Sequence, residues 1–147
     1  MSRVASGVSV VTTRDAEGRP HGLTVSAFCS VSAEPPMVLA CIHKQTGSHY
    51  AFFESQAFVV NVLADGQRSV SQQFASPADD KFNGIQVEES IDGLPKIVGC
   101  LATLECRIAQ THDGGDHTIL VGSIERTTIA EGKPLMYFRG DYRTISE

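Results

Sequence analysis

The chain has 147 residues, of which 12 are Lys or Arg and 17 are Asp or Glu, giving a formal net charge of −5. This length predicts one domain spanning residues 1–147, and the scattered basic residues do not favour binding to nucleic acid or to an anionic membrane surface. No apolar stretch approaches the roughly 20 residues of a membrane span. The start at Met1 lacks the long apolar region of a signal peptide, so we expect a cytoplasmic protein.

The sequence predicts mostly strands, which are apolar or alternating runs bounded by turns. The predicted strands are Val8–Thr13, Leu23–Ser32, Met37–Ile42, Phe58–Leu63, Leu101–Thr111, Thr118–Thr128 and Pro134–Phe138. The first two are separated by a turn and predict a hairpin. Two short helices are expected. One follows Thr46 or Ser48, which are placed to cap it, and the other runs from Gly66 to Ala75 with Asp65 as its cap.

Many strands with two short helices favour a closed or partly closed β-barrel, because closure removes exposed sheet edges. The chain has no alternation of strands and helices and no G-x-G-x-x-G after a first strand, so a Rossmann dinucleotide site is not expected. The cysteines at positions 29, 41, 100 and 106 all fall in strand-like runs and form no C-x-x-C pair. This favours reduced, buried and unreactive thiols, and the histidine spacing predicts no metal site.

The strand at Leu23–Ser32 alternates almost perfectly. Aliphatic side chains and Cys29 occupy one parity, and Phe28 with the hydroxyl residues occupies the other. Successive side chains of a strand point to opposite faces, so we expect the aliphatic row to enter the core. The other row carries no charge and suits a flat polar ligand. On the pattern alone, an ordinary outer face rich in serine and threonine remains open as the alternative.

Three further features are candidate site residues, each with a simpler alternative. The segment 46–48 precedes a helix, whose first N–H groups can hold a phosphate, although its hydroxyls can simply cap that helix. Lys81 beside Phe82 can add a cation to the same phosphate, or can be a solvated loop lysine. Gly115–His117 places an imidazole at the rim of a sheet, or forms a plain hairpin turn. No Ser-His-Asp or Cys-His arrangement is evident, so any difficult chemistry would belong to a cofactor.

The run Gly22–Pro36 is similar to the flavin-binding signature of the short-chain flavin reductases. Later segments resemble that family in the same order along nearly the whole chain. These segments are Ser6–Thr13, Phe58–Leu63, Asp80–Phe82, Gly115–Thr118 and Pro134–Phe138. The resemblance implies a mainly β fold, a six-stranded antiparallel split β-barrel with short flanking helices. It also implies a homodimer with the flavin near the subunit interface.

The resemblance further implies an NAD(P)H:flavin oxidoreductase that reduces FMN or FAD by hydride transfer from NADH or NADPH and supplies reduced flavin to a partner oxygenase. The implied contacts to the flavin ring and ribityl chain are Thr24, Val25, Ser26, Ala27, Phe28, Ser30 and Val31. The implied phosphate region is Gln45, Thr46, Gly47 and Ser48, with Lys81 and Phe82 nearby. His117 is implied to face the nicotinamide as the catalytic candidate, and Tyr142 is a second candidate for that pocket.

Two features depart from the family pattern. Only Met1–Ser6 precede the first strand, where relatives have most of a helix, and His43 stands where many relatives carry Asn. The residues do not separate FMN from FAD or NADH from NADPH. A non-catalytic flavin-binding protein for sensing, storage or electron relay is the alternative, because one fold can host several functions. A β-barrel interaction domain without a cofactor is a third.

Overall fold

The computed structural model describes residues 1–146, which are mainly β with a few short helices. Within these residues the strands are β1 (Ser6–Gly7), β2 (Ser9–Arg14), β3 (Pro20–Val25), β4 (Phe28–Ala33), β5 (Pro36–His43), β6 (Ala57–Val62), β7 (Val87–Glu89), β8 (Pro95–Ile97), β9 (Ala102–Gly114), β10 (His117–Ile129), β11 (Met136–Phe138) and β12 (Asp141–Arg143). The helices are α1 (His49–Ser55), the 3-10 turn η1 (Asp65–Gln67) and α2 (Arg68–Ala75). No helix of residues 1–146 has the length and apolar character to cross a membrane.

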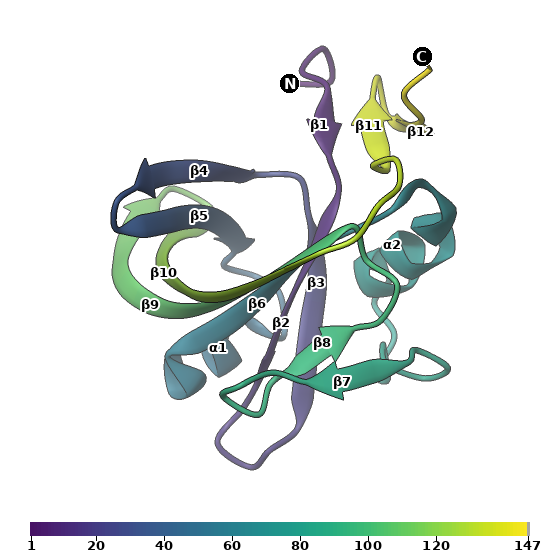
Figure 1. The fold of residues 1–147 in the computed structure, drawn as a ribbon. Coiled ribbons are helices and arrows are strands. Elements are labelled where there is room, and N and C mark those ends of the chain that lie inside the picture. The colour runs from purple at the N-terminus through teal and green to yellow at the C-terminus, as the bar shows by residue number, and fades with distance from the viewer. Residues whose placement is uncertain (147) are drawn as a thin grey trace.

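Seven strands form one antiparallel sheet in the order β3-β2-β6-β9-β10-β5-β4, and Figure 1 shows that this sheet curls strongly. The hairpin of β9 and β10, with 13 residues in each strand, lies in the interior of this curled sheet. Its register shifts between Val121 and Gly122 and again between Ile124 and Arg126. Such irregularities bend a strand and increase its twist, so they allow the long hairpin to follow the curve.

The predicted strand Leu23–Ser32 is divided in the structure. Its first part belongs to β3, which pairs with β2, and its second part belongs to β4, which pairs with β5. Because β3 and β4 are the two edges of the sheet, the link through Ser26 and Ala27 joins one edge to the other. Counted as one strand, this segment joins β2, β5, β6, β9 and β10 to give the six strands of the predicted split barrel.

The division also reverses which side chains face inward. Leu23 and Val25 are buried as the alternation predicts, but Cys29 is exposed and Val31 is 49% exposed. Phe28, from the opposite parity, packs against the main core cluster instead. The prediction of one continuous aliphatic inner face is therefore wrong beyond Val25. The prediction that all cysteines are buried holds for Cys100 and Cys106, but it is wrong for Cys29, which is exposed, and for Cys41, which is only partly buried.

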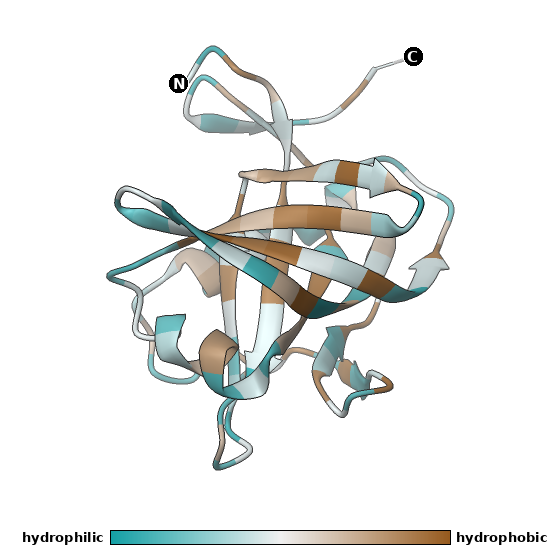
Figure 2. Cartoon of the chain, turned by 90° about the vertical axis from the view of Figure 1, so that its left-hand side faces the viewer, coloured by the Kyte–Doolittle hydropathy of each residue, from teal (hydrophilic) through white to brown (hydrophobic). Residues whose placement is uncertain are grey.

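The core has two main clusters. One fills the curled sheet around Phe52, Phe58 and Leu120, which are fully buried. The other lies beneath α2, where Phe74 is buried and Val70 packs against the same cluster, as their i, i+4 spacing predicts. Figure 2 shows apolar segments along the middle of the sheet strands and hydrophilic turns at their ends.

Two small β units lie outside the main sheet. The β7–β8 hairpin, which the sequence did not predict, is held by the buried Asn61, whose Oδ1 accepts a hydrogen bond from the Ile97 N–H at 2.8 Å. Thr12 Oγ1 also donates to the Pro95 carbonyl at 2.6 Å. The second unit, β1-β11-β12, lies near both chain ends (Figure 1) and contains the last predicted strand.

Gly122 of β10 provides a test of the packing inside the curled sheet. A Cβ at this position would lie 2.5 Å from Phe58 Cζ and 3.0 Å from Cys106 Cβ. Overpacking a core typically costs about 1–3 kcal/mol, so Gly122→Ala should lower the free energy of unfolding by about that amount in urea denaturation. The control is Gly66→Ala, whose Cβ meets no atom within 4 Å. Equal stability of the two variants would contradict this account of the packing.

Candidate functional site

A cleft of about 820 Å³ opens where three segments of the chain meet. These are the beginning of β3 with the turn before it, the loop before α1, and the loop after α2. The four residues of the predicted phosphate region, Gln45, Thr46, Gly47 and Ser48, line this cleft, and so do Lys81 and Phe82, which were predicted to lie nearby. The structure therefore brings together two predicted segments that lie far apart in the sequence. The volume is in the range typical of small-molecule sites.

Ser48 lies at the N-cap position of α1, but its side chain makes no capping hydrogen bond. The prediction that a hydroxyl caps this helix is therefore wrong. The side chain is drawn away because Ser48 Oγ lies 3.1 Å from Nδ1 of His21 in β3. Ser48 is buried, with 8% of its surface exposed, and it lines the cleft. Its hydroxyl is thus held by the neighbouring strand.

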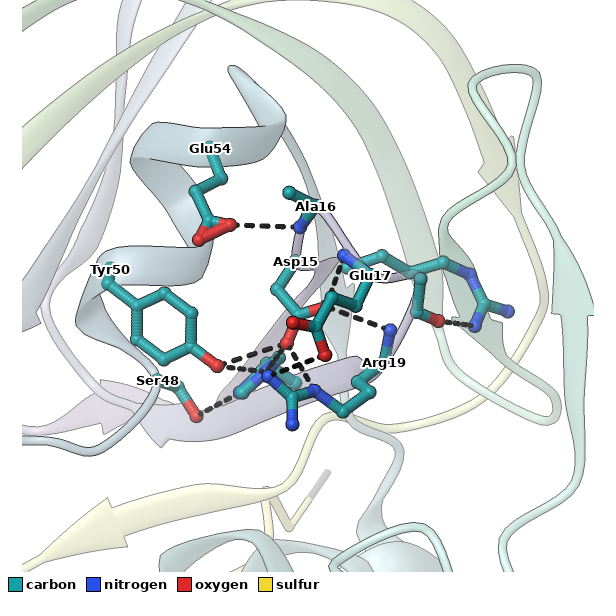
Figure 3. Close-up of polar contacts among 10 residues, drawn as sticks. Asp15, Ala16, Glu17, Arg19, Ser48, Tyr50 and Glu54 are labelled. Carbon is teal, nitrogen blue, oxygen red and sulfur yellow. Dashed lines mark hydrogen bonds and ion pairs between the residues drawn. The ribbon is translucent and has the colours of Figure 1, made fainter.

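Asp15, in the turn between β2 and β3, is the centre of a polar network (Figure 3). Its side chain is 1% exposed, and its Oδ2 accepts hydrogen bonds from His21 Nε2 at 3.0 Å, Tyr50 Oη at 3.0 Å and Arg19 Nε at 2.9 Å. Burial raises the pKa of Asp15, but the hydrogen bonds from His21, Arg19 and Tyr50 outweigh burial and hold that pKa far below its usual value. Asp15 is consequently an ionised acceptor.

The network also fixes the protonation of Tyr50. The hydrogen bond to Asp15, followed by burial, raises the pKa of the Tyr50 hydroxyl. Tyr50 therefore remains a donor to Asp15 near neutral pH. Arg19 completes the group, because its guanidinium pairs with Asp15 and lies 3.3 Å from Glu17. The sequence carries no motif that singles out Asp15, Arg19, His21 and Tyr50. The first three lie on the hairpin of β2 and β3, and only Tyr50, from α1, comes from a separate segment.

Lys81 brings a positive charge to the opposite side of the cleft. Its ammonium donates to the backbone carbonyls of Phe74 at 3.2 Å and Gly22 at 3.4 Å, and it forms no ion pair with any carboxylate of residues 1–146. Burial lowers the pKa of Lys81. A half-buried ammonium that faces a cleft without an ion pair fits an anionic ligand group, which would supply the missing charge-assisted hydrogen bond. Asp79 and Asp80 line the same side.

A smaller cavity of about 200 Å³ shares one lining residue, Ala75, with the cleft. The predicted ring contacts Thr24, Val25 and Ser26 line it together with Tyr142. Thr24 Oγ1 donates to the Ser71 carbonyl at 2.6 Å, and Ser71 Oγ lies 2.7 Å from Tyr142 Oη, so α2 holds both side chains in place. Neither cavity is lined by the other predicted ring contacts, Ala27, Phe28, Ser30 and Val31.

His117 begins β10 at the rim of the sheet, as the turn pattern predicts, and its side chain is 38% exposed. It pairs in register with His43 of β5, and the two rings meet edge to face at 4.9 Å. Its Nδ1 lies 2.6 Å from Asp116 Oδ1. His117 lines neither cavity, but its neighbour Thr118 bonds His49, the residue after Ser48, at 2.9 Å. Tyr142 lies in the smaller cavity with the predicted ring contacts.

Comparison with known proteins gives a consistent result. A family model described as "Flavin reductase like domain" matches residues 1–146. The chain is 42% identical over 150 residues to "Flavin reductase (NADH)" of Kitasatospora aureofaciens, covering 97% of this chain and 76% of that protein. It is 40% identical over 146 residues to the reductase subunit HsaB of a flavin-dependent monooxygenase of Rhodococcus jostii, covering 99% and 74%.

Solved structures agree with these matches. Nitrilotriacetate monooxygenase component B from Mycobacterium thermoresistibile superposes with a TM-score of 0.94 at 36% identity, covering 99% of this chain and 82% of that one. The NADH:FAD oxidoreductase SgcE6 of Streptomyces globisporus, solved in complex with NAD and FAD fragments, superposes with a TM-score of 0.93 at 33% identity, covering 99% and 88%.

The low pKa of Asp15 predicts a pH-dependent contribution to stability. A carboxylate whose pKa is lower in the folded state contributes stability above its unfolded pKa, near 4, and loses it as the pH falls through the folded pKa. Asp15→Asn should therefore destabilise the chain at pH 7, and the difference from wild type should shrink below about pH 4. Urea unfolding at pH 7, 4 and 3 measures this.

Asp79→Asn is the matched control, since Asp79 is an exposed loop residue. This substitution should leave the free energy of unfolding unchanged at each pH. A destabilisation by Asp15→Asn that is equal at pH 7 and pH 3 would contradict the role assigned to the ionised carboxylate.

Proposed function

The chain belongs to the flavin reductase-like family and is an NAD(P)H-dependent flavin reductase, and we propose that its cleft and the smaller cavity together hold the flavin. The observation that carries this assignment is that two unlike cavities share a lining residue, Ala75. The cleft is lined by hydroxyls and by charged side chains that include the Lys81 ammonium, while the cavity is lined by an uncharged strand and two tyrosines. A flavin has the same division between an anionic tail and a flat ring.

We assign the phosphate of the flavin to the end of the cleft between Ser48 and Lys81. Lys81 supports this assignment because its ammonium bonds carbonyl oxygens only and forms no ion pair within residues 1–146. Thr46, Gln45 and Gly47 line the same end. The ring is assigned to the cavity, along Thr24–Ser26 and beneath Tyr142. If the phosphate lies beside Lys81, replacing Lys81 with an uncharged residue should weaken the binding of phosphorylated flavins and leave the binding of flavins without a phosphate unchanged.

When bound, the flavin supplies the redox chemistry by accepting a hydride from the reduced nicotinamide. The residues of the chain bind and orient the two reactants, which alone can account for a large share of the rate. We assign the nicotinamide carboxamide to His117. The hydrogen bond from His117 holds the pKa of Asp116 below its ordinary value, so Asp116 remains an acceptor for Nδ1 and leaves Nε2 available.

We propose an oxygenase component as the consumer of the reduced flavin. The support is the names of relatives, among them the reductase component of a 4-nitrophenol 4-monooxygenase of Rhodococcus opacus, which is 38% identical. The four free thiols support a reducing compartment, which agrees with a cytoplasmic location.

We also propose that the functional unit is a homodimer in which a second copy covers β4. This strand is an edge of the sheet, its residues Phe28–Ala33 carry no charge, and Val31 is exposed. Edge strands of monomeric proteins are usually protected by charged residues, especially lysine, or by covering segments. A second copy on β4 would bring Ser30 and Val31 to the boundary between the subunits, where the family resemblance expects flavin contacts.

The activity is tested by mixing the purified protein with each pairing of NADH or NADPH with FMN or FAD. We expect flavin-dependent loss of reduced-nicotinamide absorbance with at least one pairing. His117→Ala should raise the KM for the nicotinamide about three- to tenfold, the range of one lost hydrogen bond, and should leave the Kd for flavin unchanged.

The control for this variant is His112→Ala, which removes an exposed histidine of β9 that bonds Gln110. It should behave as wild type. Absence of oxidation with every pairing would disprove the reductase assignment, whereas an unchanged KM in His117→Ala would disprove only the role of His117.

Light scattering on a sizing column tests the homodimer. We expect the mass of two chains for the wild type and of one chain for Val31→Glu, because the carboxylate would have to be buried without a partner. Val87→Glu is the control, since Val87 is similarly exposed but lies on β7, outside the main sheet. A single-chain mass for the wild type would refute the proposal.

A further inference from the structure

We propose that His21 is a positioning residue that selects flavins with an anionic tail, because its charge state decides whether Ser48 can donate a hydrogen bond into the cleft. This inference rests on the proposed function, and specifically on the phosphate lying beside Ser48. It concerns a chain of three side chains, Asp15, His21 and Ser48, which is referred to below as the Asp15–His21–Ser48 relay. His21 and Ser48 both line the cleft.

One nitrogen of His21 is fixed as a donor. Nε2 lies 3.0 Å from Asp15 Oδ2, and the side chain of Asp15 is almost fully buried and ionised. An ionised carboxylate only accepts hydrogen bonds, so Nε2 must carry its proton whether the ring is neutral or positively charged. With Nε2 fixed as a donor, the nitrogen that can either accept or donate is Nδ1, which lies 3.1 Å from Ser48 Oγ.

The two charge states leave different atoms of Ser48 facing the cleft. When His21 is neutral, Nδ1 can only accept, so the single hydroxyl proton of Ser48 points at the ring. The Ser48 oxygen then presents only lone pairs to the cleft, and these repel an anion. When His21 is protonated, Nδ1 donates to Ser48 Oγ, and the hydroxyl proton is released to donate to a phosphate oxygen. Ser48 is buried, so few alternative partners compete for this proton.

Charge and hydrogen bonding act in the same direction. A phosphate in the cleft is attracted by the positive ring and bonded by the released hydroxyl, and both effects favour the protonated state. Coupling between two bound species is reciprocal, so a phosphate that favours the proton is itself bound more tightly when the proton is present. A flavin without a phosphate lacks the anionic group, so its binding should not depend on the charge of His21.

The other charged groups around His21 act as a fixed background. The turn before β3 contributes Asp15 and Arg19, and α1 contributes the Tyr50 hydroxyl, which donates to Asp15. Glu17 balances Arg19 at 3.3 Å. Across the cleft lie Lys81, Asp79 and Asp80. Histidine is the side-chain type among them that ordinarily changes charge between pH 5 and 8.

The same three residue types form the triad of serine hydrolases, but the arrangement here differs. In the serine protease triad, histidine Nε2 faces the serine and Nδ1 faces the aspartate. Here Nδ1 faces Ser48 and Nε2 faces Asp15, which also accepts from Arg19 and Tyr50. We therefore assign the Asp15–His21–Ser48 relay to anion recognition. Hydrolysis of p-nitrophenyl acetate that disappears in Ser48→Ala would overturn this assignment.

The test measures the Kd of FAD and of riboflavin for the full chain at pH 8 and pH 6 by quenching of flavin fluorescence. The two pyrophosphate charges of FAD persist throughout this range, so the ligand's own phosphate titration does not contribute. For the wild type, we expect the Kd of FAD to fall about tenfold from pH 8 to pH 6, the size of one charge-assisted hydrogen bond, and the Kd of riboflavin to stay constant. Calorimetry in two buffers should detect proton uptake with FAD only.

His21→Gln keeps hydrogen-bonding capacity and removes the charge, so the pH difference for FAD should vanish while riboflavin binding is retained. Ser48→Ala should weaken FAD binding at pH 6 and narrow the pH difference. The control His112→Gln should keep the full difference.

A full pH difference in His21→Gln, or an equal difference with riboflavin in the wild type, would overturn the inference while leaving flavin binding established. If the wild type binds neither flavin at either pH, the proposed function fails, and the inference fails with it.

Discussion

The link at Ser26 and Ala27 determines how the sheet closes, because the residues on its two sides pair with strands that lie at different places in the sheet. β3 hydrogen bonds to β2 and β4 to β5, so both edges of the sheet belong to one continuous segment. The break is held by backbone hydrogen bonds of 3.0 Å from Phe28 N to Ser26 O and from Cys41 N to Ala27 O. A sheet whose two edges are joined by two residues must curl, and the register shifts of β10 accommodate that curl.

The candidate flavin site lies along the same edge. β3 carries His21 and Gly22 to the cleft and Thr24 and Val25 to the smaller cavity, so one strand supplies both regions. α2 supplies the facing wall. Gly22 makes the close approach of α2 possible, since a Cβ there would lie 2.7 Å from Phe74 Cε1. The Gly22 carbonyl in turn accepts from Lys81, which connects the packing of the helix to the charge in the cleft.

The sequence predicts this molecule well where the signal is local or resembles a family. It predicts the core strands, the i, i+4 face of α2 and the residues that meet at the cleft. It fails where a tertiary contact overrides local preference. The alternation of residues 23–32 carries no sign of the turn that reverses it at Ser26. The predicted capping of α1 by Thr46 or Ser48 fails because the Ser48 hydroxyl bonds His21 of another strand, a contact that the local sequence does not show. The β7–β8 hairpin was missed because Asn61, 36 residues away, accepts its backbone N–H.

The central proposal for this molecule is that the anionic tail and the ring of a flavin occupy the two cavities that share Ala75. A crystal structure of the protein with FAD tests this claim most directly. We expect a pyrophosphate oxygen within hydrogen-bonding distance of Ser48 Oγ and Lys81 Nζ, with the isoalloxazine ring along Thr24–Ser26 beneath Tyr142. A flavin that leaves Ser48 and Lys81 without contact, or whose ring lies away from Thr24–Ser26, would contradict it.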